Sequence, residues 1–389
     1  MSFNKKTTIL ITCILISTLI LLIILCFQKS NTQEKLQETQ NAIVTIEHDV
    51  FNDIIFQINP KKLSEKIEIL KIKHLPNWSI NASNIITDGL MFVTIPNDNR
   101  QIDNPRNNAE IAMIDLMSKN KITIGHDADL MIKPVFDRHN QNVIYRSTIG
   151  GKTRIISYNL EKSIKKTIYS INESYPIIPI FVKNDNLFVV YQDHQGSSLM
   201  YVDEGKLNQF AKMSNNFTRN WSISPNKEKL LYLEQDMTVD RSSNKIKLLD
   251  ISSRMSTQVN FNETTNNEIL AIGTPAFKDT DSISFFSPIW ASKNSTISFG
   301  SATTKMNSIY PVTTYDLNSK KIAIVSNLEK GIEMPIAYNS TNKYLLTKNF
   351  NIETFPEEKI YILNTATQTR IGLDAEKYII YAGWWETNN

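Results

Sequence analysis

Short apolar runs alternate with polar turns along most of the chain, and they form a unit that recurs seven times. In each unit an apolar run ends on an Asp or Asn, and a polar turn and a further short run follow it. These anchor residues are Asn59, Asp115, Asn159, Asp203, Asp250, Asp316 and Asn364. By subtraction they are 56, 44, 44, 47, 66 and 48 residues apart. A period of about 40 to 50 residues with several strands per unit is typical of a β-propeller.

Each unit shows the same order of four predicted strands. The first carries a Pro or Trp, as in Pro179–Phe181 and Trp221–Ile223, and an apolar second strand follows a polar turn. The third strand ends at the anchor residue. The fourth strand follows it, and residues 321–325 are an example. Four antiparallel strands per unit make one propeller blade. An Asp or Asn side chain accepts a backbone N–H two residues on, so we interpret the anchors as turn residues and not as ligands.

The two ends of the chain complete each other. Residues 42–46 and 54–70 supply a second, third and fourth strand without a marked first one. Residues 378–385 supply a marked first strand with nothing after it. Pairing 42–70 with 378–385 therefore closes a seventh blade and protects the edges that an open ring would leave. Six blades with an N-terminal cap is the alternative.

The repeats resemble those of the bacterial TolB-like, or WD40-like, β-propellers. Their pattern, P-x-W/F-S-P-D-G-K followed by an apolar strand and an Asp-marked hairpin, is closest at Ile223–Leu233 with Ile246–Asp250. Asn226 and Lys227 stand where the family has Asp and Gly, so the motif is degenerate. The resemblance covers about residues 42–389 and implies an all-β propeller fold. The N-terminal domain of TolB has no counterpart here, so its interaction with Pal-type lipoproteins is not implied.

An apolar segment precedes the repeats. Residues 9–27 carry no charge and follow Lys5 and Lys6, and 19 residues of helix span about 28 Å, close to a bilayer core. Leu25 is too bulky for a cleavage site or a lipobox, which favours an uncleaved anchor over a cleaved signal or a lipoprotein. Basic residues before the segment predict a cytoplasmic N-terminus. The predicted division is a cytoplasmic tail (1–8), a single transmembrane anchor (9–27), a polar stalk (28–41) and an extracytoplasmic propeller (42–389).

Charge and cysteine content exclude several classes of function. The 42 basic and 39 acidic residues give a net charge of +3 and no basic stripe, so we expect no nucleic-acid partner. Both cysteines, Cys13 and Cys26, lie in the apolar segment. The predicted propeller therefore contains no disulfide, no cysteine zinc ligand and no cysteine nucleophile.

Five tryptophans are the candidate ligand-binding residues, and each is assigned to a marked first strand near the axis of the ring. They are Trp78, Trp221, Trp290, Trp384 and Trp385. Aromatic side chains give large contact areas at low entropic cost, which suits a glycan or peptide site. Packing between neighbouring blades explains them equally well. The adjacent pair Trp384 and Trp385 is the better candidate, because adjacent strand residues point to opposite faces.

Other polar groups support no catalytic, cofactor or metal assignment. The cluster His126, Asp127 and Asp129 could bind a cation but is interpreted as a solvated turn. No G-x-S-x-G nucleophile motif is present. Two units are overlong, at 96–108 and within 260–286, and long loops on a rigid scaffold are candidate functional sites.

These features favour a membrane-anchored, non-catalytic binding or scaffold module for a protein, a peptide or an envelope glycan. The alternative is a propeller hydrolase or lyase with a metal-assisted site at the axis. A purely structural role in the cell envelope is the third hypothesis.

Overall fold

The structure is a computed structural model that describes most of residues 41–386. The described ranges are 41–83, 86–97, 107–172, 176–235, 244–261, 283–291, 294–303, 310–326, 328, 331–350, 358–375 and 377–386. The predicted anchor, nearly all of the stalk, and most of both overlong stretches lie outside these ranges. Among the residues described, none belongs to a helix that is long and apolar enough to cross a membrane.

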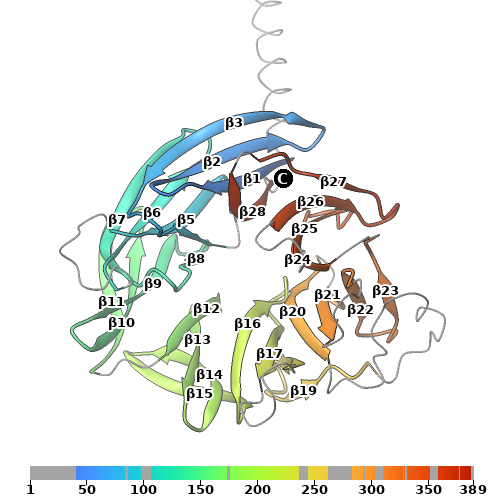
Figure 1. Ribbon diagram of the computed structural model, residues 1–389. Coiled ribbons are helices and arrows are strands. Elements are labelled where there is room, and N and C mark those ends of the chain that lie inside the picture. The colour runs from blue at the N-terminus through green and yellow to red at the C-terminus, as the bar shows by residue number, and fades with distance from the viewer. Residues whose placement is uncertain are drawn as a thin grey trace, which may run out of the picture.

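Seven four-stranded antiparallel sheets stand around a ring as the blades of a propeller (Figure 1). Blade I contains β28 (Tyr378–Glu386), β1 (Asn41–His48), β2 (Asn52–Asn59) and β3 (Lys62–Lys73). Blade II contains β4 (Asn81–Ala82), β5 (Leu90–Ile95), β6 (Ala109–Asp115) and β7 (Asn120–Ala128). Blade III contains β8 (Val135–Asp137), β9 (Asn142–Ile149), β10 (Lys152–Asn159) and β11 (Ile164–Ile171).

The remaining four blades follow in chain order. Blade IV contains β12 (Ile177–Lys183), β13 (Asn186–Asp193), β14 (Gly196–Asp203) and β15 (Lys206–Ser214). Blade V contains β16 (Phe217–Ile223), β17 (Lys229–Gln235), β18 (Asn244–Asp250) and β19 (Ser256–Gln258). Blade VI contains β20 (Ile283–Trp290), β21 (Thr296–Thr303), β22 (Thr313–Asp316) and β23 (Ile322–Ile324). Blade VII contains β24 (Ile332–Tyr338), β25 (Tyr344–Phe350), β26 (Glu358–Asn364) and β27 (Arg370–Gly372).

The predicted seven-bladed architecture is confirmed, and the six-bladed alternative is wrong. The first strand of each blade lies nearest the centre of the ring and the fourth lies at the rim (Figure 1). In blade I the innermost strand is β28, from the end of the chain, and it pairs with β1 from Asn41↔Glu386 to His48↔Tyr378. The two ends of the propeller are thus joined within one sheet, so the ring has no open seam.

The seven anchors are the last residues of the third strands, as the repeat predicts. Six of them accept a backbone N–H from two or three residues on, at 2.7–3.2 Å. The exception is Asp203, for which no side-chain hydrogen bond is found. The Ser252 hydroxyl and the Ser253 N–H both donate to Asp250 and lower the pKa of that carboxyl to about 2. The anchors therefore fix the outer hairpins.

Replacing Asp250 by Ala is expected to cost about 1 kcal/mol of unfolding free energy at pH 7, because two donors lose their acceptor. Because the pKa of this carboxyl is lower in the folded protein than its ordinary value of 3.8, the ionised group stabilises the fold at pH values above 3.8. That contribution is lost as the pH falls towards 2. Urea unfolding of wild type and Asp250→Ala should therefore differ less at pH 3 than at pH 7. Asp203→Ala serves as the matched control, with little effect at either pH. A pH-independent difference would contradict this account.

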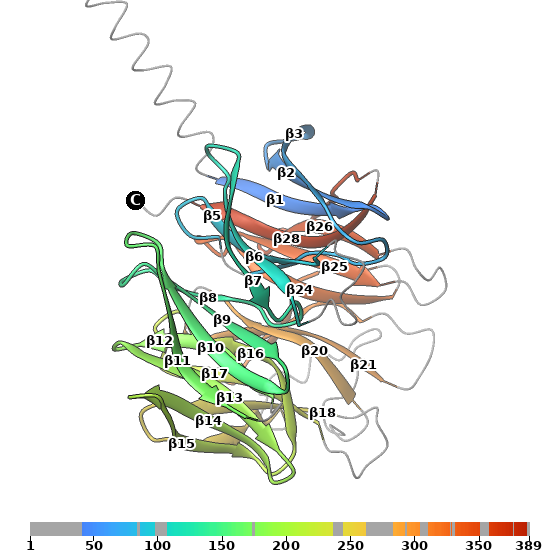
Figure 2. The same cartoon turned by 90° about the vertical axis from the view of Figure 1, so that its left-hand side faces the viewer.

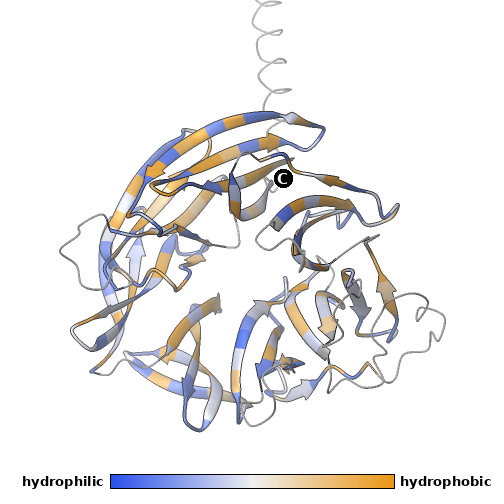
Figure 3. Ribbon diagram, in the orientation of Figure 1, coloured by the Kyte–Doolittle hydropathy of each residue, from blue (hydrophilic) through white to orange (hydrophobic). Residues whose placement is uncertain are grey.

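The core is divided among the junctions between blades. Seven clusters of buried apolar side chains are found in the described residues, and each joins two neighbouring blades. Figure 3 shows apolar residues along the strands and hydrophilic residues at many of the turns. Each blade therefore buries both faces of its sheet against its neighbours, and closure of the ring is needed for all seven clusters to form.

The ring has two faces that differ in their connections (Figure 2). The turns between first and second strands and between third and fourth strands lie on the face at which β1 begins, which we call the entry face. The turns between second and third strands, and the links from one blade to the next, lie on the opposite face.

Candidate functional site

A polar groove of about 560 Å³ lies between blades III and IV. Its lining comes from the β8–β9 turn, the β12–β13 turn and the β14–β15 turn, together with the strand residues beside them. All three turns lie on the entry face. The groove therefore lies on the entry face, the face of the ring at which β1 begins.

Local backbone geometry places acidic residues at the mouth of the groove. Asn184 and Asp185 form a two-residue turn with φ of 49° and 62°, and Glu204 and Gly205 form another with φ of 46° and 77°. Such turns need positive φ at both positions and match the twist of a hairpin. Asn140 spans the two blades, because its amide donates to Asp137 Oδ2 and to Asp185 Oδ1, both at 2.9 Å.

The groove has a negative net charge, whereas the net charge of the whole chain is positive. Its lining includes the carboxylates of Asp137, Asp185, Asp203 and Glu204 and one ammonium group, that of Lys166. Four negative charges and one positive charge give −3, against +3 for the whole chain. No aromatic side chain lines the groove. The site thus offers charge and hydrogen bonds to a ligand, and little flat apolar area.

The five tryptophans do not form a common surface. Trp290, Trp384 and Trp385 are buried, at 7%, 9% and 2% exposure, and Trp221 is half-buried. Trp290 Nε1 donates to Ser222 O at 2.9 Å, and Trp384 Nε1 donates to Ala337 O at 3.0 Å. Each of these two bonds reaches the first strand of the preceding blade. The geometry favours packing between blades over the binding interpretation.

Trp384 and Trp385 face opposite sides of β28, as adjacent strand residues do. Trp384 packs in the cluster shared with blade VII, and Trp385 packs in the cluster shared with blade II. The assignment of Trp78 to a first strand is wrong. It lies in the link between β3 and β4, just after Asn77, whose φ of 64° turns the chain before β4 begins.

The carboxylates of the predicted His126 cluster have separate partners. Asp127 accepts from Tyr145 Oη at 2.9 Å and from Lys165 Nζ at 2.8 Å. Asp129 Oδ2 lies 3.2 Å from Arg146 Nε. Burial and the charge of Asp127 raise the pKa of Tyr145. These two acids therefore form ion pairs and do not face a common cation.

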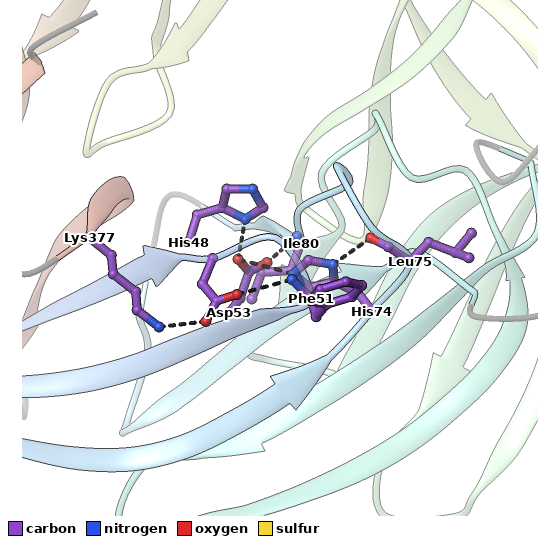
Figure 4. Close-up of polar contacts among 8 residues, drawn as sticks. His48, Phe51, Asp53, His74, Leu75, Ile80 and Lys377 are labelled. Carbon is purple, nitrogen blue, oxygen red and sulfur yellow. Dashed lines mark hydrogen bonds and ion pairs between the residues drawn. The ribbon is translucent and has the colours of Figure 1, made fainter.

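Blade I instead brings together three other residues that have ligand atoms (Figure 4). His48 ends β1, Asp53 is the second residue of β2, and His74 follows β3. His48 Nδ1 lies 2.7 Å and His74 Nε2 lies 3.3 Å from Asp53 Oδ1. The sequence analysis missed this group, because its members are 5 and 21 residues apart and meet only through strand pairing.

No family model matches this chain, and no curated protein matches its sequence. Solved structures do match. An oligogalacturonate lyase in complex with manganese has a TM-score of 0.56 at 8% identity, over 83% of this chain and 90% of that one. A prolyl endopeptidase has a TM-score of 0.55 at 12% identity over 90% of this chain, which spans about half, 51%, of the endopeptidase.

TolB from Acinetobacter baumannii is also among the matched structures, with a TM-score of 0.49 at 11% identity over 89% of this chain and 82% of that one. At these identities the matches establish the fold alone. This chain is a seven-bladed β-propeller, and its structural neighbours include TolB proteins.

Proposed function

We propose that this protein is a membrane-anchored, extracytoplasmic propeller that binds a cationic segment of another protein, without catalysis, in the groove between blades III and IV. The observation that carries the proposal is the charge of −3 in that groove on a chain of charge +3. A negative cleft attracts and orients a positively charged partner. The groove is the site and the ring is the rigid scaffold for it.

The lining favours a peptide segment over a glycan. Without aromatic side chains the groove offers no flat surface for a sugar ring, whereas its carboxylates suit ammonium and guanidinium groups. Asn140 already bonds Asp137 and Asp185, which holds two of the acceptors in place before a ligand arrives. A Lys or Arg side chain entering the groove would meet acceptors that are already fixed, so the Asp side chains would lose little further conformational entropy on binding.

The position of the groove fits the predicted anchor. The groove lies on the entry face, and the predicted stalk and anchor precede the strand that begins there. With such an anchor, the groove would face the membrane. The partner that we propose therefore presents its basic segment on the extracytoplasmic side, close to the membrane surface.

We prefer binding to the alternative of a metal-assisted hydrolase or lyase because of where the metal-capable group lies. Within the described ranges, His48, Asp53 and His74 are the one such group found, and they belong to the second and third strands of blade I and to the residue after the fourth. The axial site that the alternative requires would instead lie at the innermost strands. Manganese bound to a lyase of the same fold is a property of that lyase.

The test is a selection of random seven-residue peptides on the propeller, followed by titration of the enriched peptides against variants. We expect the enriched peptides to carry Lys or Arg. The triple change Asp185→Asn, Asp203→Asn and Glu204→Gln should weaken their binding by about 10- to 100-fold, because each charge contributes about 0.5–1 kcal/mol. Binding should also weaken as salt is added.

A control triple carries the same change of charge outside the groove: Glu65→Gln, Glu68→Gln and Asp374→Asn, all exposed on blades I and VII. We expect this variant to bind the selected peptides as the wild type does. Enriched peptides without basic residues, or an equal loss in both variants, would show that the groove is not the site.

A further inference from the structure

We propose that His48, Asp53 and His74 form a binding site for a divalent transition-metal ion, with zinc as the ion that fits best. One ligand atom from each residue lies within 4.8 Å of the other two. His48 Nδ1 and His74 Nε2 are the nitrogens that approach Asp53 Oδ1. Two imidazoles and one carboxylate are a ligand set found for zinc with an open fourth position. This site is separate from the groove and does not depend on the function proposed there.

The tautomer of His74 supports a metal over a hydrogen bond. Its Nδ1 lies 2.8 Å from the carbonyl oxygen of Leu75, and because a carbonyl only accepts, Nδ1 carries the proton. In the neutral ring Nε2 then has a free lone pair. That nitrogen has no hydrogen-bond partner in the structure, although the side chain is fully buried and Nε2 lies 3.3 Å from Asp53 Oδ1. A buried lone pair that faces a carboxylate is unfavourable unless a cation lies between them.

The two separations from Asp53 Oδ1 lie close to those around a tetrahedral ion. Ligands about 2.0–2.1 Å from a tetrahedral zinc ion are roughly 3.3 Å apart. His74 Nε2 and Asp53 Oδ1 are already separated by 3.3 Å. His48 Nδ1 and Asp53 Oδ1 are separated by 2.7 Å and must move apart by roughly 0.6 Å. His48 can make this movement, because its side chain is 24% exposed while that of Asp53 is fully buried.

Groups around the cluster hold the ligands in the orientation that a metal needs. Asp53 Oδ2 accepts the Ile80 N–H at 2.7 Å, which leaves Oδ1 turned to the two rings. Lys377 Nζ donates to Asp49, so this ammonium group is held by another acid beside the cluster (Figure 4). Such outer contacts, which fix the tautomer and the ring orientation, accompany metal-binding histidines.

The location suggests what the ion does. Its ligands come from β1, from β2 and from the link to blade II, and Ile80 lies in that same link. A bound ion would therefore fasten the blade that contains both ends of the chain to its neighbour. Binding only to the folded state stabilises that state, so the ion would act as a clip on the closed ring.

The experiment uses the full chain, freed of metal by dialysis against a chelator, and titrates it with Zn²⁺ and Co²⁺. We expect one equivalent of Zn²⁺ to bind with heat, visible absorption from tetrahedral Co²⁺, and a Tm about 4 °C higher with saturating Zn²⁺. His48→Gln should lower the affinity at least 100-fold, and it is the safest variant because His48 is the most exposed of the three ligands. His194→Gln, an exposed histidine on blade IV, should leave binding unchanged.

Two results would overturn the proposal. One is a wild-type protein that takes up neither ion and whose His74 Nε2 is protonated by ¹⁵N NMR, which would make the cluster a hydrogen-bonded ion pair. The other is a His48→Gln protein that binds zinc as tightly as the wild type, which would place the ion elsewhere.

Discussion

Ending the chain at Lys377 is expected to unfold the propeller, whereas ending it at Glu386 leaves it folded. The shorter chain lacks β28, the innermost strand of blade I, which pairs with β1 at eight positions. Without it, β1 becomes an exposed edge in the middle of the ring. The loss is therefore larger than that of a peripheral strand.

The two tryptophans on β28 make this loss large. Trp384 contributes to the cluster at the junction with blade VII, and Trp385 contributes to the cluster at the junction with blade II. Removing one large buried aromatic side chain costs about 3–5 kcal/mol. Losing both, together with the strand pairing, approaches the whole stability of an ordinary domain, about 5–15 kcal/mol.

Circular dichroism and thermal unfolding of the two truncated chains will show the difference. We expect no cooperative transition for the chain that ends at Lys377, and a wild-type Tm for the chain that ends at Glu386. A third variant, Thr45→Cys with Ala382→Cys, joins directly paired and buried positions of β1 and β28. Its disulfide should form on oxidation and raise the Tm. A folded chain without β28 would mean that blade I closes the ring in some other way.

The architecture was predictable because the repeat is a local signal. An Asp or Asn at the end of each third strand satisfies its own turn, so the spacing of these residues along the chain counts the blades. Closure followed from the count, since the first unit lacked a first strand and residues 378–385 supplied one. A degenerate repeat can therefore indicate a closed ring when its first and last units together supply the four strands of one blade.

The sites were not predictable, because neither of them has a local sequence signal. Three turns from two blades build the groove, and Asp137 of blade III meets Asp185 and Glu204 of blade IV there only after the two blades have packed together. The metal-capable group joins His48, Asp53 and His74 across three strand ends, without a fixed spacing that a sequence motif could express. The tryptophans could not be assigned to binding or to packing from the sequence, because aromatic side chains are suited to both.

Replacing Gly196 by Ala is expected to destabilise the protein far more than the same change at Gly151, although both glycines have positive φ. At Gly151, with φ of +73°, an added Cβ meets no atom within 4 Å. Only the cost of the left-handed backbone then remains, about 1–2 kcal/mol. At Gly196, with φ of +110°, the added Cβ would lie 2.3 Å from Ser214 O and 2.5 Å from Asn215 C.

The contacts at Gly196 are with backbone atoms, so no side chain can move to relieve them. Relief requires β14 to shift against β15, where Ser197 pairs with Ser214. Beside that pair, Gln192 Nε2 donates to Thr218 O at 2.6 Å and links blade IV to blade V. Overpacking of a rigid site adds about 1–3 kcal/mol or more to the backbone cost. We therefore expect a total of about 2–5 kcal/mol or more for Gly196→Ala, measured by urea unfolding. Equal losses of unfolding free energy for the two variants would contradict this expectation. They would show that the β13–β14 turn can adjust, and that the close contact between the Asn215 backbone and Gly196 does not fix the junction between blades IV and V.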